Sequence, residues 1–325
     1  MNWITYGLEL ILSFCIAWFL LQKVKSLGTN KGSTGQLRWS SQKVPTLGGL
    51  VLFLSFLLAM AFHRENVSFV IMAIPAFFAA FITGLWDDMR SISPRLKLIG
   101  QLLASVLMLV CSDISLLSLN AVLLVFLMIA LMNSLNMLDN MDGVAAAIVL
   151  MFCAWNIAAG DVWPSLFIVP GLLVFLFFNL RPAKMYLGDG GSLFLGLFIG
   201  YVGIGFVSEG RWGELHLDVQ LISTLCLLFC LPAADTLLVV INRLMAGISP
   251  AVGGRDHSTH HLVYAGVREE FIPWLYSIVY SSPWIMFSVF NFPIVSSLIY
   301  FVLVFAALFL ISRRNISQRK FVYPS

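Results

Sequence analysis

The sequence predicts an all-α, polytopic membrane protein, and three observations support this fold class. Hydrophobic residues make up 60% of the 325 residues and charged residues only 11%, whereas about a quarter of the residues in a soluble domain are charged. The mean hydropathy is +0.93. Apolar runs near the length needed to cross a bilayer recur along the whole chain. No stretch has the composition of a separate soluble domain, so we expect residues 1–325 to form one integral membrane domain.

The apolar runs predict about eleven transmembrane helices. No basic residue precedes the first run, and Lys23 and Lys25 follow it, which argues against a cleaved signal peptide. Pro283 and Pro293 make the division between the last two spans approximate. The expected spans are 3–21, 48–62, 68–85, 97–111, 115–133, 144–159, 163–179, 191–207, 219–242, 271–290 and 293–311.

The distribution of basic residues predicts the orientation of these helices. If the N-terminus lies outside, all but two of the 19 Lys and Arg residues fall in cytoplasmic segments or in the C-terminal tail. The two exceptions are Arg64 and Arg211. Cytoplasmic connections of membrane proteins carry an excess of Lys and Arg. The pattern therefore predicts an outer N-terminus, a cytoplasmic C-terminus and an active site on the cytoplasmic face, where the polar motifs gather.

A polar stretch between the fifth and sixth spans is the first candidate functional site. Asn133, Asn136, Asp139 and Asp142 recur at every third residue, and Gly143 follows them. In a tightened helical end this spacing keeps the side chains near one face, and the glycine can turn the chain. Oxygen ligands beside water suit a hard divalent cation and a phosphorylated substrate. Asn and Asp are also ordinary cap residues, so a purely structural polar cap is the alternative.

Two further acidic motifs are expected on the same face. Asp87 and Asp88 are adjacent, so on a helix their side chains diverge and divide their work. One could meet a metal or a phosphate, while the other holds a base or orients a neighbour; Lys97 follows at the start of the next span. Asp189 lies between glycines at the start of a span, where the backbone can approach a ligand and the helix end favours anions. Each motif could instead cap or anchor a helix.

The last cytoplasmic loop holds three of the five histidines within five residues. Zinc is disfavoured there, because no cysteine lies nearby and the other candidate ligands are hard oxygen donors. We expect this group to contact the phosphates of an anionic substrate, with a solvated basic loop as the alternative. Asp235, inside the ninth span, is expected to support the inner wall of the site. The candidate residues of the loop are Arg255, His257, His260 and His261.

Five motifs in order make the chain similar to the polyprenyl-phosphate N-acetylhexosamine-1-phosphate transferases, which form glycosyltransferase family 4. Two of them are the Asp-Asp pair with its later lysine and the histidine-rich loop. The other three are Pro-Thr-x-Gly-Gly from Pro45, Asn-x-x-Asn-Met-x-Asp-x-x-Asp-Gly from Asn133, and Gly-Asp-x-Gly-Ser from Gly188. The resemblance covers most of the chain and is closest to the bacterial undecaprenyl-phosphate GlcNAc-1-phosphate transferase branch, which has eleven spans and an outer N-terminus.

The resemblance also implies roles for the candidate residues. Asp189 would bind Mg²⁺, for which Mn²⁺ could substitute, and Asn136 would lie close to the same ion. Asp139 and Asp142 would hold the uridine end of the nucleotide, with Asn133 as a further substrate-binding residue. These roles follow from matching motifs and not from the spacing itself.

The remaining roles concern catalysis and the sugar. The implied catalytic residues are Asp87, Asp88, Lys97 and Asp189, with the first two handling the lipid phosphate and the lysine contacting phosphate. The residues that would face the sugar and the diphosphate are Arg255, His257, His260 and His261. The chain departs from the family pattern at Asn140, where glycine is common, and in the order of residues in the histidine loop. The second departure leaves the role of His257 and the sugar specificity open.

On this basis we expect transfer of an N-acetylhexosamine 1-phosphate, with GlcNAc 1-phosphate favoured, from a UDP-sugar to undecaprenyl phosphate, with release of UMP. The expected setting is the bacterial inner (cytoplasmic) membrane, at the start of cell-envelope polysaccharide synthesis such as that of O-antigen in lipopolysaccharide. The expected partners are the UDP-sugar, undecaprenyl phosphate and the bilayer, without nucleic acid; a homodimer is left open.

Three alternatives accompany this interpretation. Within the family, the donor could be UDP-MurNAc-pentapeptide or an epimer or deoxy relative of UDP-GlcNAc. A membrane transporter is the alternative from another class, although transporters keep their ionisable residues near the midplane. A prenyltransferase with Asp-rich metal sites would need neither the Asn–Asp stretch nor the histidine loop.

Overall fold

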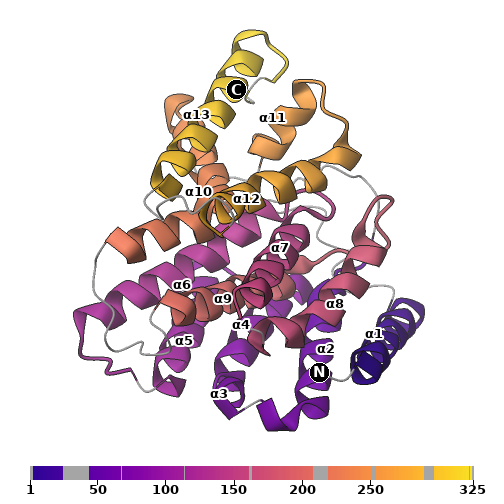
Figure 1. Ribbon diagram of the computed structural model, residues 1–325. Coiled ribbons are helices and arrows are strands. Elements are labelled where there is room, and N and C mark those ends of the chain that lie inside the picture. The colour runs from indigo at the N-terminus through magenta and orange to yellow at the C-terminus, as the bar shows by residue number, and fades with distance from the viewer. Residues whose placement is uncertain are drawn as a thin grey trace.

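A computed structural model describes residues 3–24, 44–66, 68–112, 114–160, 163–207, 219–249, 254–288, 296–321 and 323. Within these ranges every regular element is a helix, which confirms the predicted all-α class (Figure 1). The α-helices are α1 (Trp3–Lys23), α2 (Gly48–Phe62), α3 (Ser68–Ile71), α4 (Ile74–Met89), α5 (Pro94–Cys111), α6 (Leu119–Leu138), α7 (Val144–Ala158), α8 (Trp163–Asn179), α9 (Gly188–Val207), α10 (Val219–Met245), α11 (Ser258–Tyr264), α12 (Ile272–Ser288) and α13 (Ser296–Ser317). Short 3-10 helices span Arg64–Asn66 and Glu269–Phe271.

Each predicted apolar run falls on helix in the described part of the chain, and one run is divided. The run at 68–85 forms α3 and α4 in place of a single helix, because Pro75 stands in the first turn of α4 and has no backbone N–H to continue a preceding helix. Five described helices are long and apolar enough to cross a membrane: α1, α5, α6, α10 and α13. The total of eleven spans and the outer N-terminus stay predictions.

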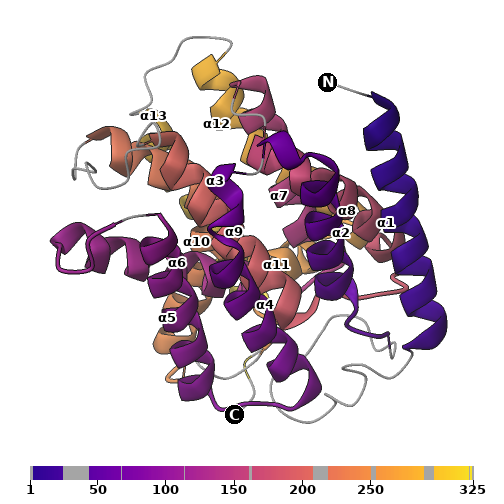
Figure 2. The ribbon, with the colours of Figure 1, turned by 90° about the horizontal axis from the view of Figure 1, so that it is seen from below.

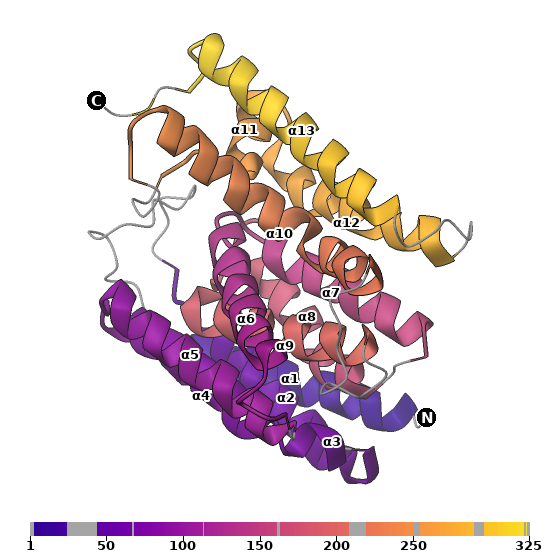
Figure 3. The same cartoon turned by 90° about the vertical axis from the view of Figure 1, so that its left-hand side faces the viewer.

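Helix α9 lies at the centre of the bundle. All residues of the range 188–203 are buried, and the helix packs most extensively against α4 and α6 (Figure 3). Small residues allow this close approach. A Cβ at Gly196 would lie 2.6 Å from Met132 Cα, and a Cβ at Gly84 would lie 2.2 Å from the carbonyl oxygen of Asp189. The polar motif at the start of α9 is therefore held by helices from distant parts of the chain.

The other helices surround this centre. α5 lies against α4 and α6, whereas α10, α12 and α13 form the opposite side together with the short α11 (Figure 3). α1 packs on α2 and α8 at one edge (Figure 2), where Glu9, the single charged residue of the first predicted span, contacts His63 at 2.6 Å. Large apolar side chains such as Ile99 and Leu303 are exposed on outer helices. Exposed apolar surface of this kind is expected of helices that face lipid.

Cysteine labelling tests the predicted orientation. In a variant without the five native cysteines, we expect a single cysteine next to Arg211 to be labelled from outside in intact cells. A single cysteine next to Gly253 should be labelled only after permeabilisation, because the basic residues gather on the inner side. Both positions lie outside the described residues. Labelling of both from outside would contradict the topology and place the polar motifs on two faces.

Candidate active site

A lysine and two carboxylates from three helices form the centre of the candidate active site. Lys97 Nζ donates to Asp87 Oδ2 at 3.2 Å and to Asp189 Oδ2 at 2.9 Å. The three side chains are 15%, 12% and 5% exposed, respectively. Ser93 caps α5 and Pro94 opens it, which places the lysine on the first turn. The structure thus brings together three predicted catalytic residues, two of which are 92 positions apart.

The adjacent carboxylate of Asp88 holds the start of α9. Its Oδ1 accepts from Asp189 N at 3.1 Å and its Oδ2 from Gly190 N at 3.0 Å. Gly188 has a φ of +74°, and a Cβ there would lie 2.5 Å from Asp88 Oδ2, so glycine is required. The two side chains diverge to different partners as expected, whereas their handling of the lipid phosphate stays a prediction. A carboxylate of the protein therefore satisfies these two N–H groups of the helix start.

Asn136 completes a set of oxygens around Lys97. With its amide nitrogen toward α9, Asn136 donates to Asp189 Oδ1 at 2.9 Å and to Ser192 Oγ at 2.8 Å, and its oxygen accepts from Lys97 Nζ at 3.2 Å. Three oxygens from three helices therefore converge on one ammonium group. Two carboxylates face a single lysine here, so an ionised centre keeps negative charge that a divalent cation could balance.

The donor set fits Mg²⁺ in the company of a phosphorylated substrate. Carboxylate and amide oxygens are hard donors, and Mg²⁺ is commonly bound by one or two carboxylates with water and substrate phosphates as its other ligands. Among the described residues, no group of three or more His, Cys, Asp or Glu side chains is placed to hold a metal by itself. Asp189, Asn136 and Asp87 are the residues that could hold such an ion.

Asn133 lies one turn before Asn136 on α6 and is engaged by α5. Gln101 Nε2 donates to Asn133 Oδ1 at 3.1 Å, and Asn133 Nδ2 donates to Gln101 Oε1 at 3.0 Å. This reciprocal amide pair fixes the two helices that carry Lys97 and Asn136. A substrate contact of Asn133 stays a prediction. Gln101 was not identified from the sequence, because a lone glutamine in an apolar run carries no motif.

The Pro-Thr-x-Gly-Gly motif supports the same helix start through its backbone. Tyr186 N donates to Pro45 O at 2.9 Å, and Gly49 N donates to Leu187 O at 2.9 Å. A Cβ at Gly49 would lie 2.4 Å from Gly191 N. Close backbone approach therefore accounts for the glycines of this motif, which holds the segment that leads into α9.

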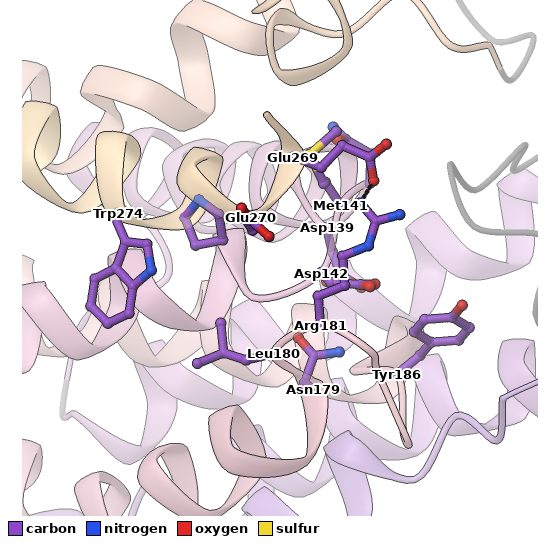
Figure 4. Close-up of a pocket in the computed structure, with 12 residues that line it drawn as sticks. Asp139, Met141, Asp142, Asn179, Leu180, Arg181, Tyr186, Glu269, Glu270 and Trp274 are labelled. Carbon is purple, nitrogen blue, oxygen red and sulfur yellow. Dashed lines mark ion pairs between the residues drawn. The ribbon is translucent and has the colours of Figure 1, made fainter. Parts of the chain in front are cut away.

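The second half of the Asn–Asp stretch leaves the helix and lines a pocket. Helix α6 keeps α-helical bonding as far as Leu138, so Asp139 and Asp142 lie in a turn and not on the tightened helical end that we predicted. Gly143 turns the chain as expected, with a φ of +79°, and its N–H donates to Asn179 Oδ1 at 2.6 Å. The pocket is lined by Asp139, Asn140, Met141, Asp142, Asn179, Leu180, Arg181, Tyr186, Glu269, Glu270, Pro273 and Trp274 (Figure 4).

This pocket combines carboxylates with two aromatic rings. Tyr186 and Trp274 stand at its opposite ends, and Arg181 forms an ion pair with Glu269 (Figure 4). Among the described residues that line the pocket, Arg181 is the single basic one, so negative charge predominates in this part of the surface. Such a surface disfavours a diphosphate and suits an uncharged group that donates hydrogen bonds. Glu269 and Trp274 were not identified from the sequence, because they lie beyond the last motif.

A buried carboxylate anchors the histidine loop. Asp235, fully buried in α10, accepts from Ser258 N at 2.7 Å and contacts His257 Nδ1 at 2.8 Å. Ser258 Oγ also bonds to Tyr276 OH at 2.6 Å. A buried charge is tolerated when it is paired and hydrogen-bonded. Asp235 thus has the supporting role expected from the sequence, and it positions the start of α11.

The last two histidines are buried and neutral. Burial lowers the pKa of His260 to about 3 and the pKa of His261 to about 4. His260 Nδ1 accepts from His257 N at 3.3 Å, and His261 Nε2 contacts Ser312 Oγ at 2.9 Å. Neutral imidazoles offer hydrogen bonds and no positive charge to a phosphate. Arg255, which is exposed, is the cation of this predicted group.

Acidification is expected to destabilise the histidine loop. In unfolded segments His260 and His261 take up protons near their ordinary pKa of about 6.5, whereas in the folded state they do so only near 3 and 4. Between these values the unfolded state binds more protons, so the free energy of unfolding falls as the pH drops below about 6.5. Although burial alone would raise the pKa of Asp256, its bonds to Arg243 at 2.7 and 2.6 Å hold that pKa below the usual range. This carboxylate therefore adds a further loss of stability only below about pH 4.

Thermal melting of the detergent-purified protein checks this prediction between about pH 7.5 and about pH 5. We expect a lower melting temperature at the acidic end and a weaker pH dependence in a variant with both His260→Asn and His261→Asn. Equal melting temperatures of the unmodified protein across this range would contradict it.

Fold and site together define a multi-pass helical membrane protein with a lysine–carboxylate centre where several helices begin or end. The sequence model of glycosyl transferase family 4 matches residues 69–207. The undecaprenyl-phosphate alpha-N-acetylglucosaminyl 1-phosphate transferase of Thermotoga maritima is 30% identical over 67% of this chain and 67% of that protein. The decaprenyl-phosphate N-acetylglucosaminephosphotransferase of Mycolicibacterium smegmatis is 28% identical over 69% of this chain and 66% of that protein. The phospho-N-acetylmuramoyl-pentapeptide-transferase of Prochlorococcus marinus is 25% identical over 81% and 77%, respectively.

The chain belongs to glycosyl transferase family 4, which confirms the family resemblance of its motifs. The range matched by the family model contains Asp87, Lys97, Asn136 and Asp189. It ends before the histidine loop, so that loop is described by this structure and not by the family match.

Proposed function

We propose that this protein transfers an N-acetylhexosamine 1-phosphate, with GlcNAc 1-phosphate preferred, from a UDP-sugar to undecaprenyl phosphate. The reaction releases UMP and starts a cell-envelope polysaccharide such as O-antigen at the cytoplasmic face of the bacterial inner membrane. The observation that carries the proposal is the convergence of Asp87, Asp189 and Asn136 on Lys97. The similarity to two polyprenyl-phosphate N-acetylglucosamine phosphotransferases supports it.

The pocket suits the uridine end of the donor. Its carboxylates, among them Asp139 and Asp142, can accept hydrogen bonds from ribose hydroxyls and from the N–H of uracil. The rings of Tyr186 and Trp274 offer apolar surface for a base. Tyr186 shortly precedes Asp189 in the chain, so a donor seated in the pocket can extend its phosphates toward Lys97.

The lysine–carboxylate centre suits attack by one phosphate on another. An oxygen of the lipid phosphate attacks the β-phosphorus of the donor; the bond to UMP breaks, UMP takes the electron pair, and the sugar–phosphate bond stays intact. Lys97 reduces the repulsion between the two anions. Asp87 either accepts a remaining proton of the lipid phosphate or orients that group. When bound by Asp189 and Asn136, Mg²⁺ supplies further neutralisation of charge on the diphosphate.

A second donor has a specific observation in its favour. The chain is also similar to a phospho-N-acetylmuramoyl-pentapeptide-transferase over 81% of its length. UDP-MurNAc-pentapeptide is therefore the alternative donor for the same reaction, and a donor panel on purified protein with undecaprenyl phosphate decides between the two.

The nucleotide product is expected to be UMP, and adding UMP to the lipid product should regenerate the UDP-sugar. One phosphoanhydride bond breaks and another forms, so the equilibrium should lie near balance. An ordinary glycosyltransferase cleaves the sugar–phosphate bond and releases UDP. The test uses UDP-GlcNAc labelled in the β-phosphate, undecaprenyl phosphate and purified protein, and it follows label in the lipid and UMP in solution.

Removal of divalent metal by a chelator should stop this transfer, and Mg²⁺ should restore it. Release of UDP with an unlabelled lipid would show that the proposed mechanism is wrong. If no UDP-sugar in the panel reacts, the donor assignment fails, and transport across the membrane becomes the next function to test.

A further inference from the structure

A hydrogen bond joins the histidine loop to the turn that lines the pocket. Thr259 Oγ1, in the first turn of α11, donates to Asn140 Oδ1 at 2.5 Å, across 119 positions of sequence. Asn140 is a lining residue of the pocket. A glycine at this position would offer no side chain for the contact.

Both ends of this bond are fixed by other contacts. Asn140 Nδ2 donates to Met137 O at 2.9 Å, so the amide is tied to the last turn of α6 while its oxygen receives the threonine hydroxyl. Thr259 is fully buried. Its neighbour Ser258 is bound through its backbone N–H to Asp235 at 2.7 Å. These contacts therefore hold the Thr259 hydroxyl beside the Asn140 oxygen.

Helix α11 depends on such contacts for its position. It is only seven residues long, and an isolated helix of this length is not stable in water. Asp235 holds its first residue, and Asn315 Nδ2 donates to His261 O at 2.7 Å. These two contacts tie α11 to α10 and α13. The hydrogen bond from Thr259 instead ties α11 to the α6–α7 turn, which carries Asp139 and Asp142.

We propose that the Thr259–Asn140 hydrogen bond sets the position of the histidine loop relative to the pocket, so that it controls affinity for the donor. The inference rests on the proposed function, because it assumes that the pocket holds the nucleotide end. Thr259 and Asn140 are positioning residues in this scheme. Loss of the bond should raise KM for the UDP-sugar and change kcat much less, because the lysine–carboxylate centre is held by other helices.

Thr259→Val tests the proposal, since valine keeps the shape and removes the hydroxyl. Thr259→Val leaves the half-buried Asn140 Oδ1 without its donor, and a lost hydrogen bond of this kind corresponds to a rise in KM of roughly tenfold. Thr259→Ser keeps the hydroxyl and should return KM to within about twofold of the unmodified protein. Asn140→Ala should raise KM like Thr259→Val. The double variant should be no worse than either single one, because both changes remove the same bond.

Hydrogen exchange gives a readout that does not depend on turnover. In Thr259→Val, backbone amides of the α6–α7 turn should exchange faster, while those at the start of α9 should keep their protection. An unchanged KM in Thr259→Val, or additive effects in the double variant, would overturn the role in donor affinity. Unchanged exchange in the turn would overturn the coupling itself. If the unmodified protein transfers no sugar phosphate, both the proposed function and the role of this bond in donor affinity are wrong. The exchange experiment would still show whether the bond couples the histidine loop to the α6–α7 turn.

Discussion

Asp189→Asn is expected to lose nearly all turnover while the protein still folds. The substitution keeps the shape of the side chain and removes its charge, and an amide is a weaker ligand for a hard cation than a carboxylate. Neutralisation by a bound metal is worth several kcal/mol in a transition state, so we expect kcat to fall roughly 100- to 1,000-fold. The labelled-lipid assay, run across a Mg²⁺ titration, measures the loss.

Two companion variants make this result specific. Glu65→Gln is the matched control, because it makes the same chemical change at an exposed carboxylate in the short helix after α2. Its activity should equal that of the unmodified protein. Asn136→Ala should raise the Mg²⁺ concentration needed for half-maximal activity without abolishing turnover. Near-normal activity of Asp189→Asn at saturating Mg²⁺ would remove Asp189 from the metal.

Gly84→Ala is expected to damage the site without altering any polar group. A Cβ at this position would lie 2.2 Å from the carbonyl oxygen of Asp189 and 2.4 Å from Gly190 N. Both are backbone atoms that cannot rotate away, and overpacking of this kind costs about 1–3 kcal/mol of stability. The start of α9 must move, and a displacement of about 1 Å at a reacting group can lower activity roughly 100-fold. We therefore expect both a lower melting temperature and a large loss of kcat.

Gly7→Ala is the control for this substitution. Gly7 lies in α1, and a Cβ there would meet no atom within 4 Å. Alanine also favours a helix over glycine by up to about 1 kcal/mol, so this variant should be at least as stable as the unmodified protein. If Gly84→Ala has the same melting temperature and activity as Gly7→Ala, close contact between α4 and α9 does not position Asp189.

Helix positions could be predicted from the sequence because hydrophobic run length is a local property. The bounds of α2 and α8 coincide with the predicted runs at 48–62 and 163–179. The prediction failed where partners from other helices satisfy polar residues. The fifth run was expected to end at Asn133, yet α6 continues to Leu138. Gln101 and Lys97 bind Asn133 and Asn136, so these amides need not face water.

Local sequence alone predicts which residue types gather at the candidate site, and the basic residues predict the membrane face on which they lie. Helix packing, in contrast, decides which partners two adjacent and identical groups contact. Asp87 accepts a hydrogen bond from Lys97, whereas Asp88 caps α9. The sequence around these two adjacent carboxylates does not distinguish them. The distinction arises because α4 approaches the start of α9 closely enough at Gly84 for one side chain to reach backbone N–H groups. Such an approach depends on how the helices pack, which no single stretch of sequence contains.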